Sequence, residues 1–144
     1  MSFGACIPVS ALLLALIYVP VGYHVVSSWR LFRDGVGTGK EWRRIFFQAA
    51  LIALWWTVVP LASMTILVLS LYNAERSVQG YATVVIAIAF FPDQLLGALP
   101  LTYPGPPVHF ALYWVAAMVI LLLISALVLV VQRVKISRQK PAVQ

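Results

Sequence analysis

Charged residues, and acidic residues above all, are scarce in this sequence. Only 10% of its 144 residues are charged and four are acidic, whereas 62% are hydrophobic and the mean hydropathy is +0.96. Soluble domains usually hold about 25% charged and about 45–50% apolar residues. So few charges cannot cover a surface that faces water. The composition therefore predicts an integral membrane protein built from α-helices.

Cysteines and catalytic motifs are also lacking. The single Cys6 excludes an intrachain disulfide and a cysteine-based metal cluster. No nucleophile, base and orienting acid occur at motif spacing, and the glycine-rich segment 34–40 lacks the residues of a phosphate-binding loop. Nothing basic precedes the first apolar run, so we expect a retained helix there rather than a cleaved signal peptide. The sequence predicts a protein that is not an enzyme, without a metal site, and it specifies no particular cofactor.

Long apolar runs make up most of the chain. Three of them contain no formal charge and extend over residues 7–29, 45–72 and 108–132. Each is longer than the about 20 residues that cross a bilayer. A fourth apolar segment, 81–101, has only about half a crossing before Pro92, and Asp93 follows at once. We predict an all-α membrane domain over residues 1–144 with three full transmembrane helices and a re-entrant or interfacial segment; the alternative is four transmembrane helices.

The basic residues gather in two clusters. The loop 30–44 carries five Lys or Arg and the tail 133–144 carries four, while Arg76 stands alone between them. Because basic loops tend to remain in the cytoplasm, we expect both clusters there, in the plasma (inner) membrane, with the N-terminus outside and the C-terminus cytoplasmic. Four spans would divide the basic residues evenly. Basic residues beside apolar runs suit anionic lipids, so we expect such lipids at the loop and tail and no nucleic-acid partner.

Two prolines lie inside predicted spans. A proline lacks the N–H that would bond the carbonyl four residues earlier. Pro20 therefore frees the carbonyl of Leu16, and Pro60 frees the carbonyl of Trp56. Kinks are expected at both positions.

The start of the second span has its own local signal. Thr38 followed by Glu41 three residues later is a capping-box pattern. It predicts that a helix begins near Gly39, in the aqueous loop.

Three ionisable side chains in apolar surroundings are candidate functional groups. Asp93 is the only acidic residue at membrane depth, where it could bind a cation, relay a proton or pair with a partner subunit; the alternative is a cap for a helix beginning near Gln94. His24 and His109 could share a haem only at similar depth on facing helices. The three-span arrangement separates the two histidines by most of the membrane, and each then lies near an interface.

Two adjacent tryptophans lie deep in the second span. Trp55 and Trp56 stand about 15 Å along the helix from its first apolar residue, away from the interfaces where tryptophan usually collects. Trp56, Pro60 and Ser63 share one helix face. This face is predicted to contact another helix. The alternative is a binding groove for a quinone, a pigment or a lipid tail, which Trp55 would also line.

These features together predict a small non-catalytic subunit, accessory or structural, of a larger membrane protein complex. Its helices would pack against other membrane subunits, with lipid or a hydrophobic cofactor as a further ligand. The alternative is a small homo-oligomeric transporter or channel with Asp93 near the path, because broken helices at membrane depth often form transport sites.

Overall fold

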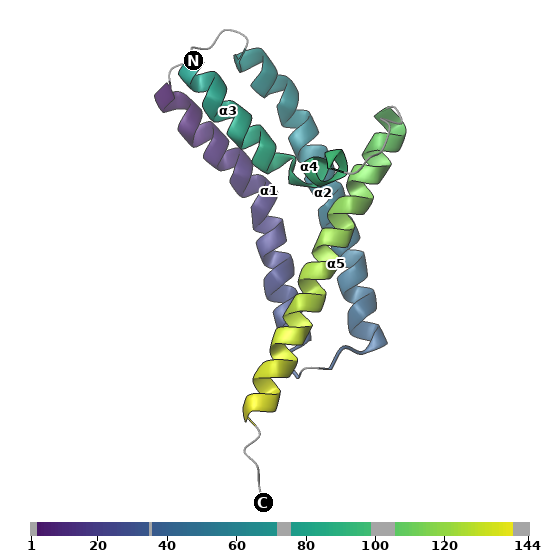
Figure 1. The fold of residues 1–144 in the computed structure, drawn as a ribbon. Helices are drawn as coiled ribbons and strands as arrows, with labels where there is room; N and C mark the ends of the chain where they lie inside the picture. The colour runs from purple at the N-terminus through teal and green to yellow at the C-terminus, as the bar shows by residue number, and fades with distance from the viewer. Residues whose placement is uncertain (1–2, 35, 72–75, 99–105, 140–144) are drawn as a thin grey trace, which may run out of the picture.

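The part of the chain that the structure describes folds into five helices, three of them long (Figure 1). A computed structural model describes residues 3–34, 36–71, 76–98 and 106–139. The helices are α1 (Phe3–Leu31), α2 (Gly39–Leu71), α3 (Arg76–Ala89), α4 (Phe91–Gly97) and α5 (Pro106–Gln139). No strand occurs in these ranges. The all-helical prediction is confirmed.

The three long helices run along one another, and the short ones cover only part of their length (Figure 1). Segments long and apolar enough to cross a membrane occur in α1, α2 and α5: Ser10–Leu31, Gly39–Ala62 and Val108–Gln139. The prediction of three such helices is confirmed. The 14 residues of α3 span only about 21 Å at about 1.5 Å per residue. α3 packs beside α1 and α2 from the end where α1 begins, and α4 then packs against α5.

The break between α3 and α4 lies at Phe90. The backbone N–H groups of Asp93 and Gln94 both donate to the carbonyl of Phe90, at 2.9 and 3.1 Å. Pro92 lies in the first turn of α4, where N–H groups have no partner within that helix, so its missing N–H does not weaken α4 itself. The expectation that Asp93 caps a helix beginning near Gln94 is wrong: α4 begins at Phe91, and no side chain caps it.

Aromatic side chains bind the carbonyls that Pro20, Pro60 and Pro92 leave without a helical partner. The bonds run from Trp55 Nε1 to Leu16 O at 2.9 Å, from Tyr113 Oη to Trp56 O at 3.4 Å, and from Tyr18 Oη to Ile88 O at 2.6 Å. Each donor belongs to a different helix from its acceptor. Such bonds restore the partners that a proline removes from a helix in an apolar medium, and they tie α1, α2, α3 and α5 together.

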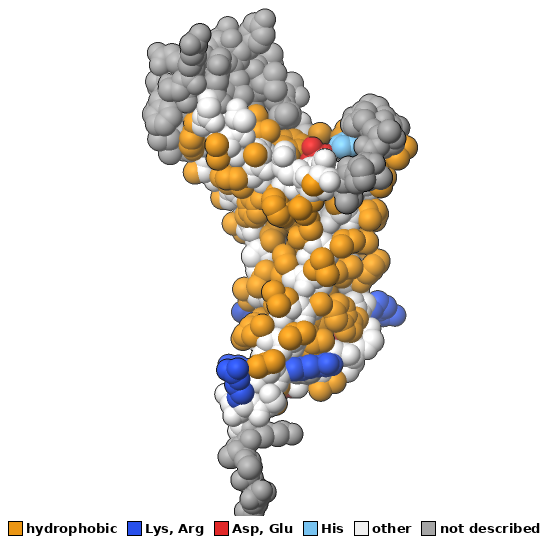
Figure 2. All heavy atoms as spheres, in the orientation of Figure 1, with side chains coloured by type: hydrophobic (Ala, Val, Ile, Leu, Met, Phe, Trp, Pro, Cys, Tyr) orange, Lys and Arg blue, Asp and Glu red, His pale blue; other side chains and the backbone are white. Residues whose placement is uncertain are grey.

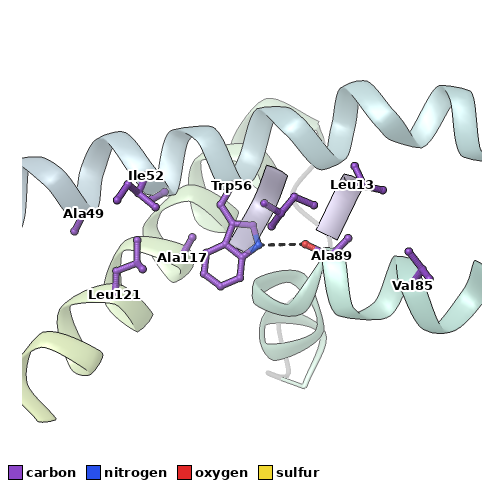
Figure 3. Packing of buried hydrophobic residues seen from close by; sticks show 10 residues of the cluster. Leu13, Ala49, Ile52, Trp56, Val85, Ala89, Ala117 and Leu121 are labelled. Carbon is purple, nitrogen blue, oxygen red and sulfur yellow. Dashed lines mark hydrogen bonds between the residues drawn. The ribbon is translucent and has the colours of Figure 1, made fainter. Parts of the chain in front are cut away.

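Trp56 lies at the centre of the main apolar core (Figure 3). Its indole is 2% exposed and donates to Ala89 O at 3.2 Å. The ring of Tyr18 meets it edge-on, with 5.5 Å between the ring centroids. The core also contains three fully buried small residues, which let the helices approach closely: Ala49, Ala53 and Ala117. The core is therefore shared by α1, α2, α3 and α5.

A second, smaller core closes the other end of the bundle. Phe32, Ile45, Val128 and Leu129 are buried there, with Trp42 packed against them. The capping box is formed beside this core: the Thr38 N–H donates to Glu41 Oε2 at 2.7 Å, and the Glu41 N–H donates to Thr38 Oγ1 at 3.4 Å. α2 begins at Gly39 as predicted.

The outer surface of the three long helices is largely apolar (Figure 2). Large exposed side chains occur on each of them, such as Tyr23 on α1, Phe47 on α2 and Leu123 on α5. Lys and Arg side chains appear at the end where α1 and α5 finish (Figure 2). A continuous apolar surface of this kind marks contact with a membrane or with other proteins.

Candidate functional site

A hydrogen bond between a carboxylate and a histidine joins the short helix α4 to the beginning of α5. His109 Nε2 lies 2.7 Å from Asp93 Oδ1, and the two side chains are 25% and 36% exposed, respectively. The turn at Phe90 directs α4 against α5 and so brings the carboxylate to the histidine. Sequence reasoning identified both residues but did not pair them. Neither helical nor strand periodicity relates residues 16 apart across a break, so no local signal could have done so.

Asp93 and His109 border a small cavity of about 70 Å³. Its lining consists of Thr57, Leu61, Phe90, Asp93, His109, Phe110 and Tyr113. The volume is far below the about 300–1,000 Å³ of drug-sized ligand pockets, so it suits water or one small ion. Figure 2 shows an acidic side chain and a histidine side by side at the surface.

The polar groups of this cavity could handle a proton or a small cation. Asp93 and His109 are the ionisable pair, and the hydroxyl of Tyr113 donates to Trp56 O, which leaves its lone pairs able to accept. The Thr57 hydroxyl donates to Ala53 O at 2.8 Å. No cluster of three or more His, Cys, Asp or Glu occurs among the described residues. The polar groups that line the cavity are thus one carboxylate, one imidazole and two hydroxyls.

His24 belongs to a separate, fully buried polar cluster between α1 and α5. Its Nε2 donates to Leu121 O at 3.1 Å and lies 2.9 Å from Ser125 Oγ. The hydroxyl of Ser125 also lies 2.9 Å from that of Ser28. Within the described chain, His24 Nδ1 has no hydrogen-bond partner. The cluster joins α1 to α5.

The two histidines do not share a site. His109 is in the first turns of α5, whereas His24 contacts Leu121 and Ser125 on the same helix. These contacts lie about 18–24 Å further along, at about 1.5 Å per residue. A haem or metal held jointly by His24 and His109 is incompatible with this arrangement.

The two tryptophans contact the chain's own helices. Trp55 is 46% exposed and its indole N–H is bonded to α1, while Trp56 is buried against α1, α3 and α5. The predicted contact surface of Trp56 and Pro60 is thus formed within the chain, and neither side chain is exposed to a partner. The side chain of Ser63 lies outside the described part of the structure. The space beside Trp56, where a groove for a quinone or pigment was the alternative, is occupied by side chains of α1, α3 and α5.

Comparison of the chain with protein-family models, curated proteins and solved structures finds no match. The fold defines its class: an all-helical protein with three helices long and apolar enough to cross a membrane. Among the described residues, the pair of Asp93 and His109 lies at one end of α5, and Arg30, Arg33 and Lys135 line a pocket at the other.

Proposed function

We propose that this protein spans the inner (plasma) membrane three times, with α3 and α4 as a re-entrant segment on the outer side. The finding that supports this topology is the position of the basic residues: Arg33 after α1 and Lys135 on α5 line the same pocket. With this end in the cytoplasm, the positive-inside rule is satisfied by both clusters. α1 then begins outside, and α5 ends in the cytoplasm. The alternative with four spans would place the two clusters on opposite sides.

Within the membrane, we propose that the protein is a non-catalytic accessory or structural subunit of a larger complex. The observation that carries this proposal is that the buried polar side chains hold the chain's own helices together, as the indole of Trp56 and the cluster of His24 do. Few of the described polar side chains then remain for binding or catalysis, whereas a broad apolar surface is available to lipid and to other subunits. In lipid such contacts depend on close packing rather than on the hydrophobic effect.

A photo-crosslinking experiment in native membranes tests this proposal. A benzophenone amino acid is placed singly at Tyr23, Phe47 or Leu123, exposed positions on α1, α2 and α5. A subunit interface should give a discrete adduct with one foreign membrane protein, from one face but not from the others. Adducts only with a second copy of the chain would favour the homo-oligomeric alternative. An absence of protein adducts at all three positions would contradict both.

A second candidate, a small transporter or channel, has one specific observation in its favour. Asp93 and His109 are polar groups in a mainly apolar cavity beside a broken helix, and broken helices of this kind form ion sites in transporters. The test is proton or sodium flux into liposomes that contain the purified protein. Asp93→Asn, which keeps size and removes charge, should abolish a genuine flux, whereas Asp34→Asn at the opposite end should not. Flux no greater than that of empty liposomes would rule this candidate out.

A further inference from the structure

A basic pocket opens between the end of α1 and the last turns of α5. Its volume is about 370 Å³, within the range of about 300–1,000 Å³ typical of ligand sites. Its lining consists of Trp29, Arg30, Arg33, Gln132, Lys135, Ile136 and Gln139. It lies at the opposite end of α5 from the cavity of His109, so it is distinct from the candidate ion site.

The charge of the pocket is of one sign. Arg30, Arg33 and Lys135 bring three cations to it, and no Asp or Glu lines it. In the described ranges, no carboxylate lies at ion-pair distance from any of the three. The carbonyl end of α1 opposes an anion here, but a helix terminus is equivalent to only about half a charge. The pocket is therefore electrostatically suited to an anion.

One polar residue of the pocket, Gln132, links the two helices that form it. Gln132 is buried, and its side-chain N–H donates to the backbone carbonyl of Trp29 at 3.5 Å. This contact holds α5 against α1 beneath the three cations. Guanidinium groups bind phosphate oxygens through pairs of parallel N–H donors, and two of the three cations are arginines. The two arginines thus favour phosphate over a simple halide.

We propose that this pocket binds the phosphate of an anionic phospholipid headgroup. Exposed apolar side chains occur within about one helical turn of the lining residues on both helices: Val26 on α1, and Val131 and Val134 on α5. A headgroup in the pocket would leave its acyl chains on this apolar surface. Trp29 at the rim is of the type that collects at the membrane interface. The inference rests on the proposed membrane topology and is independent of the accessory or transport role.

The experiment compares two variants with equal loss of charge. The pocket variant carries Arg30→Gln, Arg33→Gln and Lys135→Gln. The control variant carries Lys40→Gln, Arg43→Gln and Arg44→Gln, three exposed basic positions near the start of α2 that do not line the pocket. Both are purified in mild detergent, where topology in the cell has no effect, and are checked for helix content by circular dichroism. Native mass spectrometry then measures binding of phosphatidylglycerol and of phosphatidylcholine.

The parent protein should bind one phosphatidylglycerol per chain in preference to phosphatidylcholine. The pocket variant should bind it roughly 100-fold more weakly, at about fivefold per cation lost, while the control variant stays close to the parent. Equal weakening in the two folded variants would overturn the assignment of the pocket. Inorganic phosphate, measured separately by phosphorus NMR, distinguishes the source: pocket-dependent binding of free phosphate without any lipid preference would overturn the lipid proposal.

Discussion

The bond between the Trp55 indole and the Leu16 carbonyl gives the sharpest test of how these helices are held together. Pro20 removes the N–H that would normally bond this carbonyl, and Trp55 Nε1 binds it at 2.9 Å. Trp55→Phe keeps an aromatic ring at the position but deletes the donor. The carbonyl of Leu16 then lies in an apolar medium without its indole partner.

The expected cost follows from hydrogen bonding in membranes. Bonds between transmembrane helices average about 0.6 kcal/mol and reach about 1.7 kcal/mol, and a buried carbonyl left without a partner costs about 1–3 kcal/mol. Because Trp55 is partly exposed at the outer surface, we expect Trp55→Phe to lower the free energy of unfolding by about 1 kcal/mol. Pro20→Ala supplies the missing N–H from within α1. In that background Trp55→Phe should cost only a few tenths of a kcal/mol.

The assay is a double-mutant cycle on reversible unfolding in mixed micelles, followed by far-ultraviolet circular dichroism so that the loss of an indole does not alter the signal. Trp114→Phe serves as the control. Its Nε1 donates to Ala50 O at 3.0 Å, a carbonyl that no proline frees, so Pro20→Ala should not reduce its cost. If Trp55→Phe costs the same with and without Pro20, the freed carbonyl is not what Trp55 stabilises, and the reasoning fails.

Three further outcomes are expected. Ala117→Leu should destabilise the protein by about 1–3 kcal/mol in the same unfolding assay, because a fully buried small residue leaves no room for a larger one. Asp93→Ala should cost about 0.5–1 kcal/mol there, since its bond to His109 is only partly buried. Single cysteines at Arg33 and Lys135, in a chain whose native cysteine is replaced, should both react with an impermeant thiol reagent only after the cytoplasmic side is opened; labelling of one alone in intact cells would contradict the topology.

The elements of the fold could be read from the sequence because their signals are local. A charge-free run of sufficient length predicts a long apolar helix, and the pair of Thr38 and Glu41 predicts where α2 begins. The carbonyls freed by Pro20 and Pro60 could be identified for the same reason, since a proline acts on the residue four positions earlier.

The partners of those carbonyls could not be predicted. Trp55 lies 39 residues from Leu16, and Tyr113 lies 57 residues from Trp56. Which donor meets which acceptor depends on the rotation and depth of one helix against another, and helical periodicity sets only the faces, not their pairing. The same limit applied to Asp93, whose partner His109 is on a different helix, α5. The sequence therefore identified Asp93 and His109 as candidates, but only the structure shows that they contact each other.

Backbone carbonyls that lack a helical partner also explain why two tryptophans lie midway along the bundle. Indole groups usually collect at membrane interfaces, where the N–H can reach water. Trp55 instead donates to a carbonyl that a proline has freed, and Trp56 donates to Ala89 O, whose usual partner, the N–H of Asp93, is turned toward Phe90. Each indole N–H thus binds a backbone carbonyl midway along the helices, whereas an indole at the membrane interface can bind water. Since apolar burial alone does not hold helices together in lipid, these directional bonds help to select which helices pack, and both indole N–H groups are bonded within the chain.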